Sequence, residues 1–434
     1  MSSKLRNKVW PFELWLFGIA VAAAVGLPVR AQAIDERPSI QIAYEDRKAK
    51  ITFFGTLLSA ESVNGPWATI TDADSPYAVD MAGAHKFYRA GSYGTNSIFS
   101  SRSLVALKLA GPLQAHFDMA FAGTPDGIFP PVREKPYFDG TLVMPGLVLP
   151  VSLRVRGNSS LQECPFPKLK FKVSQENRPG TPFADAREIK IGTHCAEGGR
   201  GSIGRLREQI AAFREVLAYE VLELVDFIAP RVRRVRIEYL DTTPPTNSTT
   251  TVGWQLIRDA LILEDIEIVA GRLGGRALSE TEITELGPGA FDAQLVADMQ
   301  LLHALLGNWD YSLGSDSRGV WNTEVVELND GSKLRLVPVA GDFDLASWVT
   351  GIARRSAPQD YHPELGEIER ETRYELEQIQ QRVAPEMYNT ARQRFAEKRG
   401  IIEAQIALAK IDEQGRANAL RHVSAFYEAL GTIR

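Results

Sequence analysis

Three short segments of this chain place an apolar residue at every second position and basic residues at positions between them. The segments are VSLRVRG (151–157), KLKFKV (168–173) and REIKIG (187–192). Because side chains alternate between the two faces of a β-strand, the apolar residues of each segment point to one face and the basic residues to the other. The pattern therefore predicts strands that each cover a core with one face.

The basic residues of these strands would share one surface if the strands pair. They are Arg154, Arg156, Lys168, Lys170, Lys172 and Lys190. A cationic sheet surface of this kind suits phosphate groups. The solvated face of an ordinary antiparallel sheet gives the same pattern, and taken alone the alternation favours that interpretation.

Helical and strand-like segments are mixed along the rest of the chain, which predicts an α+β fold. Helices are expected at 206–225, where apolar residues recur at helical spacing, and at 291–306, where Gly307 provides a stop. Further strands are expected at 234–240, 254–257 and 333–339, and the sequence from about residue 363 is charged and helical. An apolar fraction of 44% supports ordinary globular cores.

The first part of the chain predicts a separate small all-β domain. Its strand-like runs are divided by turn residues such as Asn64-Gly65-Pro66. The runs GTLLSAESVNGPWATI and HKFYRA resemble a short accessory β-module of secreted bacterial proteins, which has no known chemistry. We divide the chain into a signal peptide (1–33), this β-module (34–90), a connector with the leading edge of the next domain (91–145), the core of that domain (146–362) and a helical C-terminal region (363–434).

The N-terminus has the three parts of a bacterial export signal. Lys4, Arg6 and Lys8 precede an apolar run from Leu14 to Leu27, and the small residues of Ala31-Gln32-Ala33 follow it. We expect cleavage after this segment and a periplasmic or secreted location, the alternative being an uncleaved N-terminal anchor. Elsewhere no stretch is long and apolar enough for a membrane span, so we expect no stable membrane insertion after cleavage. A net charge of −5 does not suggest a nucleic-acid partner.

The chain has two cysteines, Cys164 and Cys195. In an oxidising compartment they would form a disulfide that closes a loop of about 30 residues and contributes ~3 kcal/mol. Two buried thiols, or metal ligation together with His194, are the alternatives. We favour the disulfide, because a metal site would need further ligands nearby and none has convincing spacing.

A second set of segments contains residues whose side-chain oxygens could bind a metal ion. Asn308-Trp309-Asp310 follows a helix end, Asn322 lies twelve residues after the aspartate, and Asp342-Phe343-Asp344 follows a strand. Carboxylates and an Asn amide suit Mg²⁺ or Mn²⁺. Each fragment alone is also typical of a helix cap or a turn. Their order along the chain carries more weight. It is the order of parts in protein-kinase-like phosphotransferases: basic strands, a helix, a strand, then N-x-D, a downstream Asn and D-F-D.

In its motifs and their order, the chain resembles the spore-coat CotH kinase family over roughly residues 150–350. VSLRVRGNSSLQECPFPKLKFKV looks like that family's entry motif, R-x-RGNSS/T followed by a basic strand. LLGNWDYS, WNTEVVEL and LVPVAGDFDLASW resemble its "GN-x-DW…N-x-K…PWDLD" core. The C-x-F-P and T-H-C motifs match a secreted branch of CotH-like proteins, which supports pairing of Cys164 with Cys195. The resemblance implies an atypical protein-kinase-like domain that uses ATP and Mg²⁺ or Mn²⁺ to phosphorylate a protein substrate.

The resemblance also assigns roles to residues. It implies that Asp310 is the catalytic aspartate, that Asn322 and Asp342 are metal ligands, and that Asp344 is a competing candidate. Candidates for contact with the ATP phosphates are Arg154, Arg156, Lys170 and Lys190, with Glu215 and Glu220 as possible partners of such a lysine. Asn158 lies in the turn 157–160, whose backbone N–H groups could cradle an anion.

Two further functions remain open. The family's "PWDLD" stands here as VAGDFD, and an exported protein meets little ATP. Both points suit a non-catalytic, pseudokinase-like binding or scaffold protein of the envelope. A metal-dependent hydrolase built on the same acidic residues is a third possibility.

Overall fold

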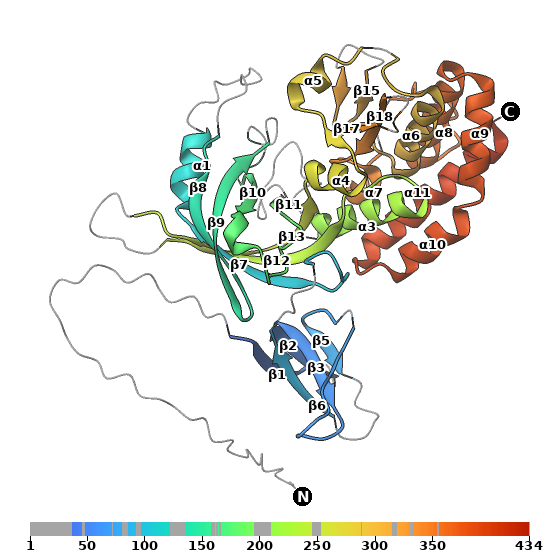
Figure 1. Ribbon diagram of the computed structural model, residues 1–434. Coiled ribbons are helices and arrows are strands. Elements are labelled where there is room, and N and C mark those ends of the chain that lie inside the picture. Colours follow the sequence, from blue (N-terminus) through green and yellow to red (C-terminus); the bar gives the residue numbers. More distant parts are fainter. Residues whose placement is uncertain are drawn as a thin grey trace, which may run out of the picture. The chain divides into compact units, whose positions relative to one another are not determined.

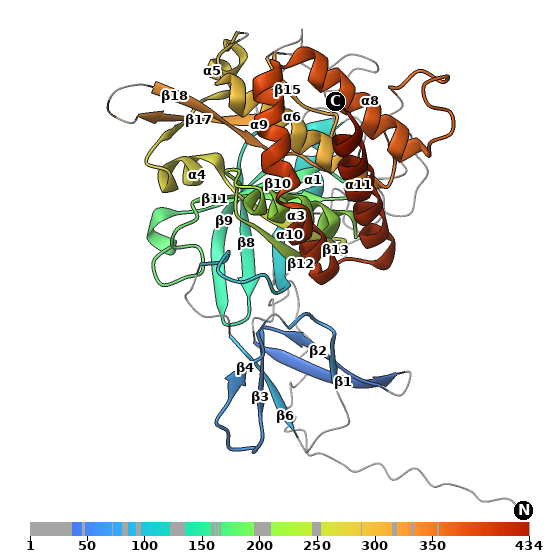
Figure 2. The same ribbon diagram turned by 90° about the vertical axis from the view of Figure 1, so that its right-hand side faces the viewer.

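The computed structural model describes most of the chain after residue 36. The described residues are 37–45, 48–71, 73–79, 86–92, 97–121, 135–157, 161, 164, 166–194, 210–244, 253–287, 289–314, 319–329, 331, 334–353 and 356–433. Figures 1 and 2 show two views of the chain, coloured along the sequence.

The segment before residue 92 forms two small sheets. One sheet has the strand order β1 (Ser39–Glu45), β2 (Lys48–Phe54), β5 (Tyr77–Val79), and the other has the order β4 (Ala68–Thr69), β3 (Thr56–Ala60), β6 (Phe87–Gly91). Ile51, Phe53 and Leu57 form a core of their own between these sheets. The predicted all-β character of this segment is thus confirmed, while the four predicted boundaries between the five segments stay predictions.

The basic strands of the sequence belong to one closed sheet, with the order β10-β11-β13-β12-β7-β8-β9 and a final pairing of β9 with β10. Its strands are β7 (Val105–Gly111), β8 (Phe138–Met144), β9 (Leu147–Arg156), β10 (Lys168–Val173), β11 (Glu188–Thr193), β12 (Val232–Asp241) and β13 (Gln255–Glu264). Only β12 and β7 pair in parallel in the described part of this sheet. The short helices α1 (Leu113–Phe121) and η1 (Gln175–Asn177) lie in its connections.

Alternation explains the interior of the closed sheet. Leu153, Phe171, Ile189 and Ile191 are each at most 1% exposed and belong to one core. The predicted strands 151–157, 168–173 and 187–192 are therefore confirmed to within a few residues. Because the apolar positions fill the interior, the basic positions between them lie on the outside of the sheet.

The remaining helices form a helical body around a second core, and all of them except α3 follow the closed sheet in sequence. Its helices are α3 (Ala211–Leu224), α4 (Ile266–Arg272), α5 (Glu280–Thr284), α6 (Ala293–Leu306), α7 (Ser347–Thr350), α8 (Glu367–Arg382), α9 (Pro385–Ala396), α10 (Arg399–Leu408) and α11 (Glu413–Thr432). It also contains the sheet β14 (Arg276–Ala277), β17 (Thr323–Asn329), β18 (Leu334–Ala340) and the pair β15 (Ser312–Leu313), β16 (Val320–Trp321). Figure 1 shows α8–α11 (red) grouped with α6.

Two helices determine where the site residues lie. α3 packs against β12 and β13 of the closed sheet and against α7 of the helical body, so it joins the two. α6 begins at Asp292, which accepts hydrogen bonds from the first-turn amides, and ends at Gly307, whose φ is 62°. That left-handed cap is the predicted stop, and it turns the chain into the segment 308–314.

The fold is therefore mixed α+β, as predicted. In the described part of the chain, no helix has the length and apolar character that crossing a membrane requires.

Candidate functional site

The cationic surface predicted from the alternation exists on the outside of the closed sheet. Lys168 lies opposite Arg156 in the register of β10 and β9, and Lys170 lies opposite Arg154. Lys170 also lies opposite Lys190 of β11. Because directly opposite residues of an antiparallel pair point to the same face, these basic side chains share one surface.

One end of this surface meets two carboxylates of the helical body. Lys168 is 8% exposed, and its Nζ lies 3.1 Å from Oδ1 of Asp342 and 2.8 Å from Oδ2 of Asp344. Burial alone would lower the pKa of Lys168, but the charges of Asp342 and Asp344 outweigh it and raise this pKa above its usual value. The side chains of Asp342 and Asp344 are 42% and 24% exposed, so the carboxylates of this ion pair are partly accessible to solvent.

The segment that carries both aspartates is held by Phe343. This side chain is fully buried and meets the ring of Tyr219, from α3, with 4.9 Å between ring centroids. The amide of Asp342 donates to the hydroxyl of Tyr219 at 3.0 Å. Asp342 has a φ of 56°, a left-handed conformation that aspartate tolerates better than most residues. Anchoring Phe343 in the core therefore places the two flanking carboxylates beside Lys168.

Glu215 of α3 adds a third carboxylate to this cluster. It is 7% exposed. Burial, and then the negative charge of Asp344, raise the pKa of Glu215 to about 8, although Lys168 opposes the change. Burial also raises the pKa of Asp344, whereas the charges of Lys168 and Arg156 outweigh burial at Asp342 and hold its pKa below the usual value. Because Glu215 is mostly protonated at neutral pH, the two cations Lys168 and Arg156 face chiefly the two carboxylates of Asp342 and Asp344.

Asp310 and Asn322 form a second pair. The Nδ2 atom of Asn322 donates to the main-chain oxygen of Asp310 at 2.7 Å and to its Oδ2 at 2.9 Å. Thr323 pairs with Ala340 at one end of the hairpin β17–β18. Asn322 immediately precedes Thr323, and Asp342 lies two residues beyond Ala340, so both residues leave the same end of this hairpin.

The predicted acidic residues are thus brought together in two pairs. Asp342 and Asp344 share the ammonium of Lys168, and Asn322 holds Asp310. Among the described residues, no three His, Cys, Asp or Glu side chains are grouped closely enough to hold a metal ion. The donors themselves fit a divalent cation, because the oxygens of Asp342 and Asp344 are hard ligands on partly exposed side chains. In this arrangement those oxygens bind the ammonium of Lys168.

Two of the predicted phosphate-binding lysines have other carboxylate partners. Lys170 forms an ion pair with Glu188 on the neighbouring strand. Lys190 forms one with Glu324 of β17 and so connects the closed sheet to the helical body. Both lysines remain on the predicted surface, but neither contacts the aspartates in the described structure.

The two predicted arginines differ in their surroundings. The guanidinium of Arg154 lies 5.4 Å from the centre of the Tyr137 ring, at the outer part of the cationic surface. Arg156 donates through Nε and Nη2 to the main-chain oxygen of Ile191, at 3.3 and 3.2 Å. Arg156 is therefore fixed beside Lys168 and within electrostatic reach of both aspartates.

Some predicted residues cannot be placed at this site. Asn158 and Cys195 lie outside the described residues. Cys164 is buried and is not a free thiol, but its pairing with Cys195 stays a prediction. Glu220, the alternative to Glu215, accepts a hydrogen bond from Gln405 at 2.7 Å and belongs to a different surface of α3.

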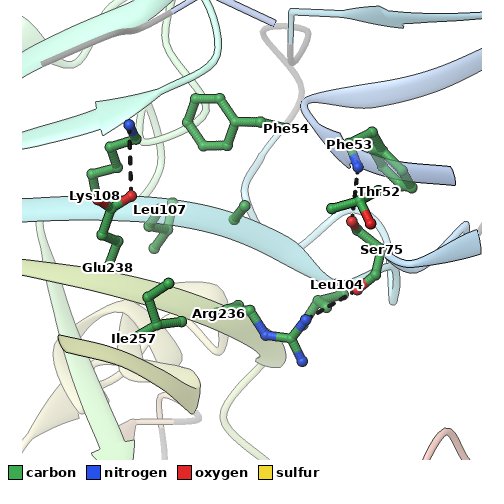
Figure 3. Close-up of a pocket in the computed structure, with 11 residues that line it drawn as sticks. Thr52, Phe53, Phe54, Ser75, Leu104, Leu107, Lys108, Arg236, Glu238 and Ile257 are labelled. Carbon is green, nitrogen blue, oxygen red and sulfur yellow. Dashed lines mark hydrogen bonds and ion pairs between the residues drawn. The ribbon is translucent and has the colours of Figure 1, made fainter. Parts of the chain in front are cut away.

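A separate hollow of about 180 Å³ lies between β2 and the outer side of β7 and β12 (Figure 3). Its charges pair with its own lining. Lys108 Nζ is 3.6 Å from Oε2 of Glu238, and Arg236 donates to the main-chain oxygen of Ser75 at 3.1 Å. The rest of the wall is mainly apolar, and it includes none of the predicted site residues.

The sequence reasoning did not single out Lys168 among the alternating basic residues, and it missed Tyr219. Lys168 differs from Lys170 and Lys172 only in its place at the start of the strand, next to the segment 157–167. Its role depends on the contact with Asp342 and Asp344, which lie about 175 positions later in the chain. The alternation of apolar and basic residues within one strand does not predict such a distant contact.

No protein-family model matches the chain, and no curated protein matches it significantly.

Proposed function

We propose that this protein is a CotH-like phosphotransferase that uses ATP and a divalent metal to phosphorylate a protein substrate. The observation that supports this most is the contact of Lys168, on the cationic sheet surface, with Asp342 and Asp344 of the helical body. A buried lysine facing two carboxylates suits binding of a metal–polyphosphate complex, because it offers a cation to phosphate and oxygens to metal. The resemblance over residues 150–350 implies the same chemistry.

In this proposal each residue has one task. Lys168 and the fixed Arg156 bind phosphate oxygens. Asp342 and Asp344 hold the metal, which would neutralise phosphate charge during transfer. Asp310, oriented by Asn322, accepts the proton of the attacking hydroxyl group.

The proposal replaces one residue assigned from the sequence and chooses between two others. Lys168 replaces Lys170 as the lysine nearest the phosphates, because Lys170 is paired with Glu188. Glu215 is preferred to Glu220 as the carboxylate beside that lysine, since the charges of Glu215 and Lys168 affect each other's pKa.

One observation favours a non-catalytic scaffold instead. The ammonium of Lys168 already satisfies both aspartates, so the cluster is complete as an ion pair without any ligand. In that case the protein would retain a kinase-like arrangement for stability alone.

A labelling experiment separates the two functions. Residues 34–434 are incubated with γ-labelled ATP, Mn²⁺ or Mg²⁺ and a general protein substrate, and compared with Asp310→Asn and Asp342→Asn. Asp139→Asn, an exposed residue of β8, is the control for loss of an acidic side chain. We expect transfer by the unsubstituted protein and the control, and at least a hundredfold loss in the other two variants. Absence of both transfer and an ATP-dependent thermal shift would contradict the proposal, and phosphate release without labelling of protein would indicate a hydrolase.

A further inference from the structure

The ammonium of Lys168 stands where the proposed metal would bind. It contacts Oδ1 of Asp342 at 3.1 Å and Oδ2 of Asp344 at 2.8 Å, so both carboxylates share one cation. A divalent ion that used these oxygens would have to approach the lysine charge closely. Cations at such a distance repel each other strongly in a partly buried site.

Lys168 can leave this position, whereas its neighbour cannot. A lysine ammonium sits on a flexible four-carbon chain and can follow an anion over several ångströms. Arg156, directly opposite Lys168 in the strand register, is held by two hydrogen bonds to Ile191. A polyphosphate bound against Arg156 would therefore find Lys168 beside it and would compete with the aspartates for its ammonium.

We propose that Lys168 excludes divalent metal ions from Asp342 and Asp344 until a polyphosphate draws its ammonium away. Metal alone then binds weakly, and metal and nucleotide each strengthen the binding of the other by the same factor. This inference rests on the proposed function, because it takes Asp342 and Asp344 as the metal ligands. It adds an order to the binding steps, in which the polyphosphate precedes the metal or arrives with it.

The decisive experiment uses Mn²⁺ alone. Binding is followed by the electron paramagnetic resonance signal of free Mn²⁺, for the unsubstituted protein, Lys168→Met and Lys172→Met. Lys172 is on the same strand but pairs with Glu188, so it is the matched control. We expect Lys168→Met to bind Mn²⁺ at least tenfold more tightly than the other two proteins. A double variant that combines Lys168→Met with Asp342→Asn should lose this increase in Mn²⁺ affinity. Equal affinity of all three proteins would overturn the inference.

A second measurement does not depend on the folding of Lys168→Met. The thermal midpoint of the unsubstituted protein is measured with Mn²⁺, with a non-hydrolysable ATP analogue plus EDTA, and with both ligands. We expect no shift with Mn²⁺ alone, a small shift with the analogue, and with both ligands a shift larger than the two together. A full shift with Mn²⁺ alone would refute the exclusion of metal by Lys168.

These results are distinguishable from the test of phosphate transfer. Tighter Mn²⁺ binding by Lys168→Met supports the inference even if no protein is labelled. Labelling of protein together with tight binding of Mn²⁺ alone would keep the proposed function and reject the inference.

Discussion

Replacing Lys168 by methionine should destabilise the protein by an amount that depends on pH. The substitution keeps the length of the side chain and removes the charge that faces Asp342 and Asp344. Removing one partner of a fully buried ion pair costs about 3–5 kcal/mol. The two carboxylates are 42% and 24% exposed, so water replaces part of the lost interaction, and we expect a loss of about 2–3 kcal/mol at neutral pH.

The pH dependence follows from the carboxylate that Lys168 stabilises. The charges of Lys168 and Arg156 hold the pKa of Asp342 below its usual value against the effect of burial. A carboxylate with a lowered pKa in the folded protein contributes stability above its unfolded pKa and loses it as the pH falls through the folded pKa. Without Lys168, burial raises the carboxylate pKa values, so protonation restores stability as the pH falls. The difference between the two proteins should therefore be smaller at pH 5 than at pH 7.5.

Urea denaturation followed by tryptophan fluorescence measures this difference. Trp348 is 1% exposed and belongs to the same core as Phe343, so it reports on the packing beneath the site. Lys172→Met is the control, with an expected cost below ~1 kcal/mol, because Lys172 is 31% exposed and its ion pair lies at the surface. A loss in Lys168→Met that is no larger than in this control, or that is the same at both pH values, would refute the reasoning.

Three further substitutions test other charged contacts. In Glu215→Gln, the free energy of unfolding measured by urea denaturation should fall less between pH 5 and 8 than in the unsubstituted protein. Burial raises the pKa of Glu215 to about 8, so the folded protein binds a proton that the unfolded chain releases in this range. Arg214→Met should lower the free energy of unfolding by about 2–3 kcal/mol, because Arg214 is 4% exposed and donates to both carboxylate oxygens of Asp412, at 2.8 and 2.6 Å. Glu264→Gln should cost about 2–4 kcal/mol in the same assay, since Glu264 is 0% exposed and its Oε2 lies 2.8 Å from Nη2 of Arg272. A cost below 1 kcal/mol in either of these two variants would contradict the importance assigned to the contact.

Local patterns were sufficient to predict the strands and helices that carry the site. Alternation located β9, β10 and β11 and correctly placed their basic residues on one surface, because that property depends only on neighbouring positions. Helical spacing and Gly307 located α6 and its end. The closure of the sheet was not predicted, since the parallel pairing of β7 with β12 joins residues about 130 positions apart.

Residue type and order selected Asp310, Asn322, Asp342 and Asp344 as candidate site residues, and their roles stay predictions. Which lysine faces the aspartates depends instead on how the closed sheet and the helical body meet, and that contact has no local signature. Lys168 contacts them because it lies at the start of β10, whereas Lys170 lies two positions further along the strand and meets Glu188.

The two candidate functions make different demands on Lys168. A scaffold needs its ion pair with Asp342 and Asp344 to be permanent, because the pair then serves only to neutralise buried charge. A phosphotransferase needs the same pair to open, since phosphate and metal must contact the groups that now contact each other. Burial raises the pKa of Glu215 to about 8, so this carboxyl group is mostly protonated at neutral pH and the charges of Lys168 and Arg156 face those of Asp342 and Asp344. A divalent metal would replace the charge of Lys168 at the two aspartates, and Lys168 would then face the negative charge of the polyphosphate, so the cluster could exchange its ion pair for a ligand without leaving buried charge unpaired.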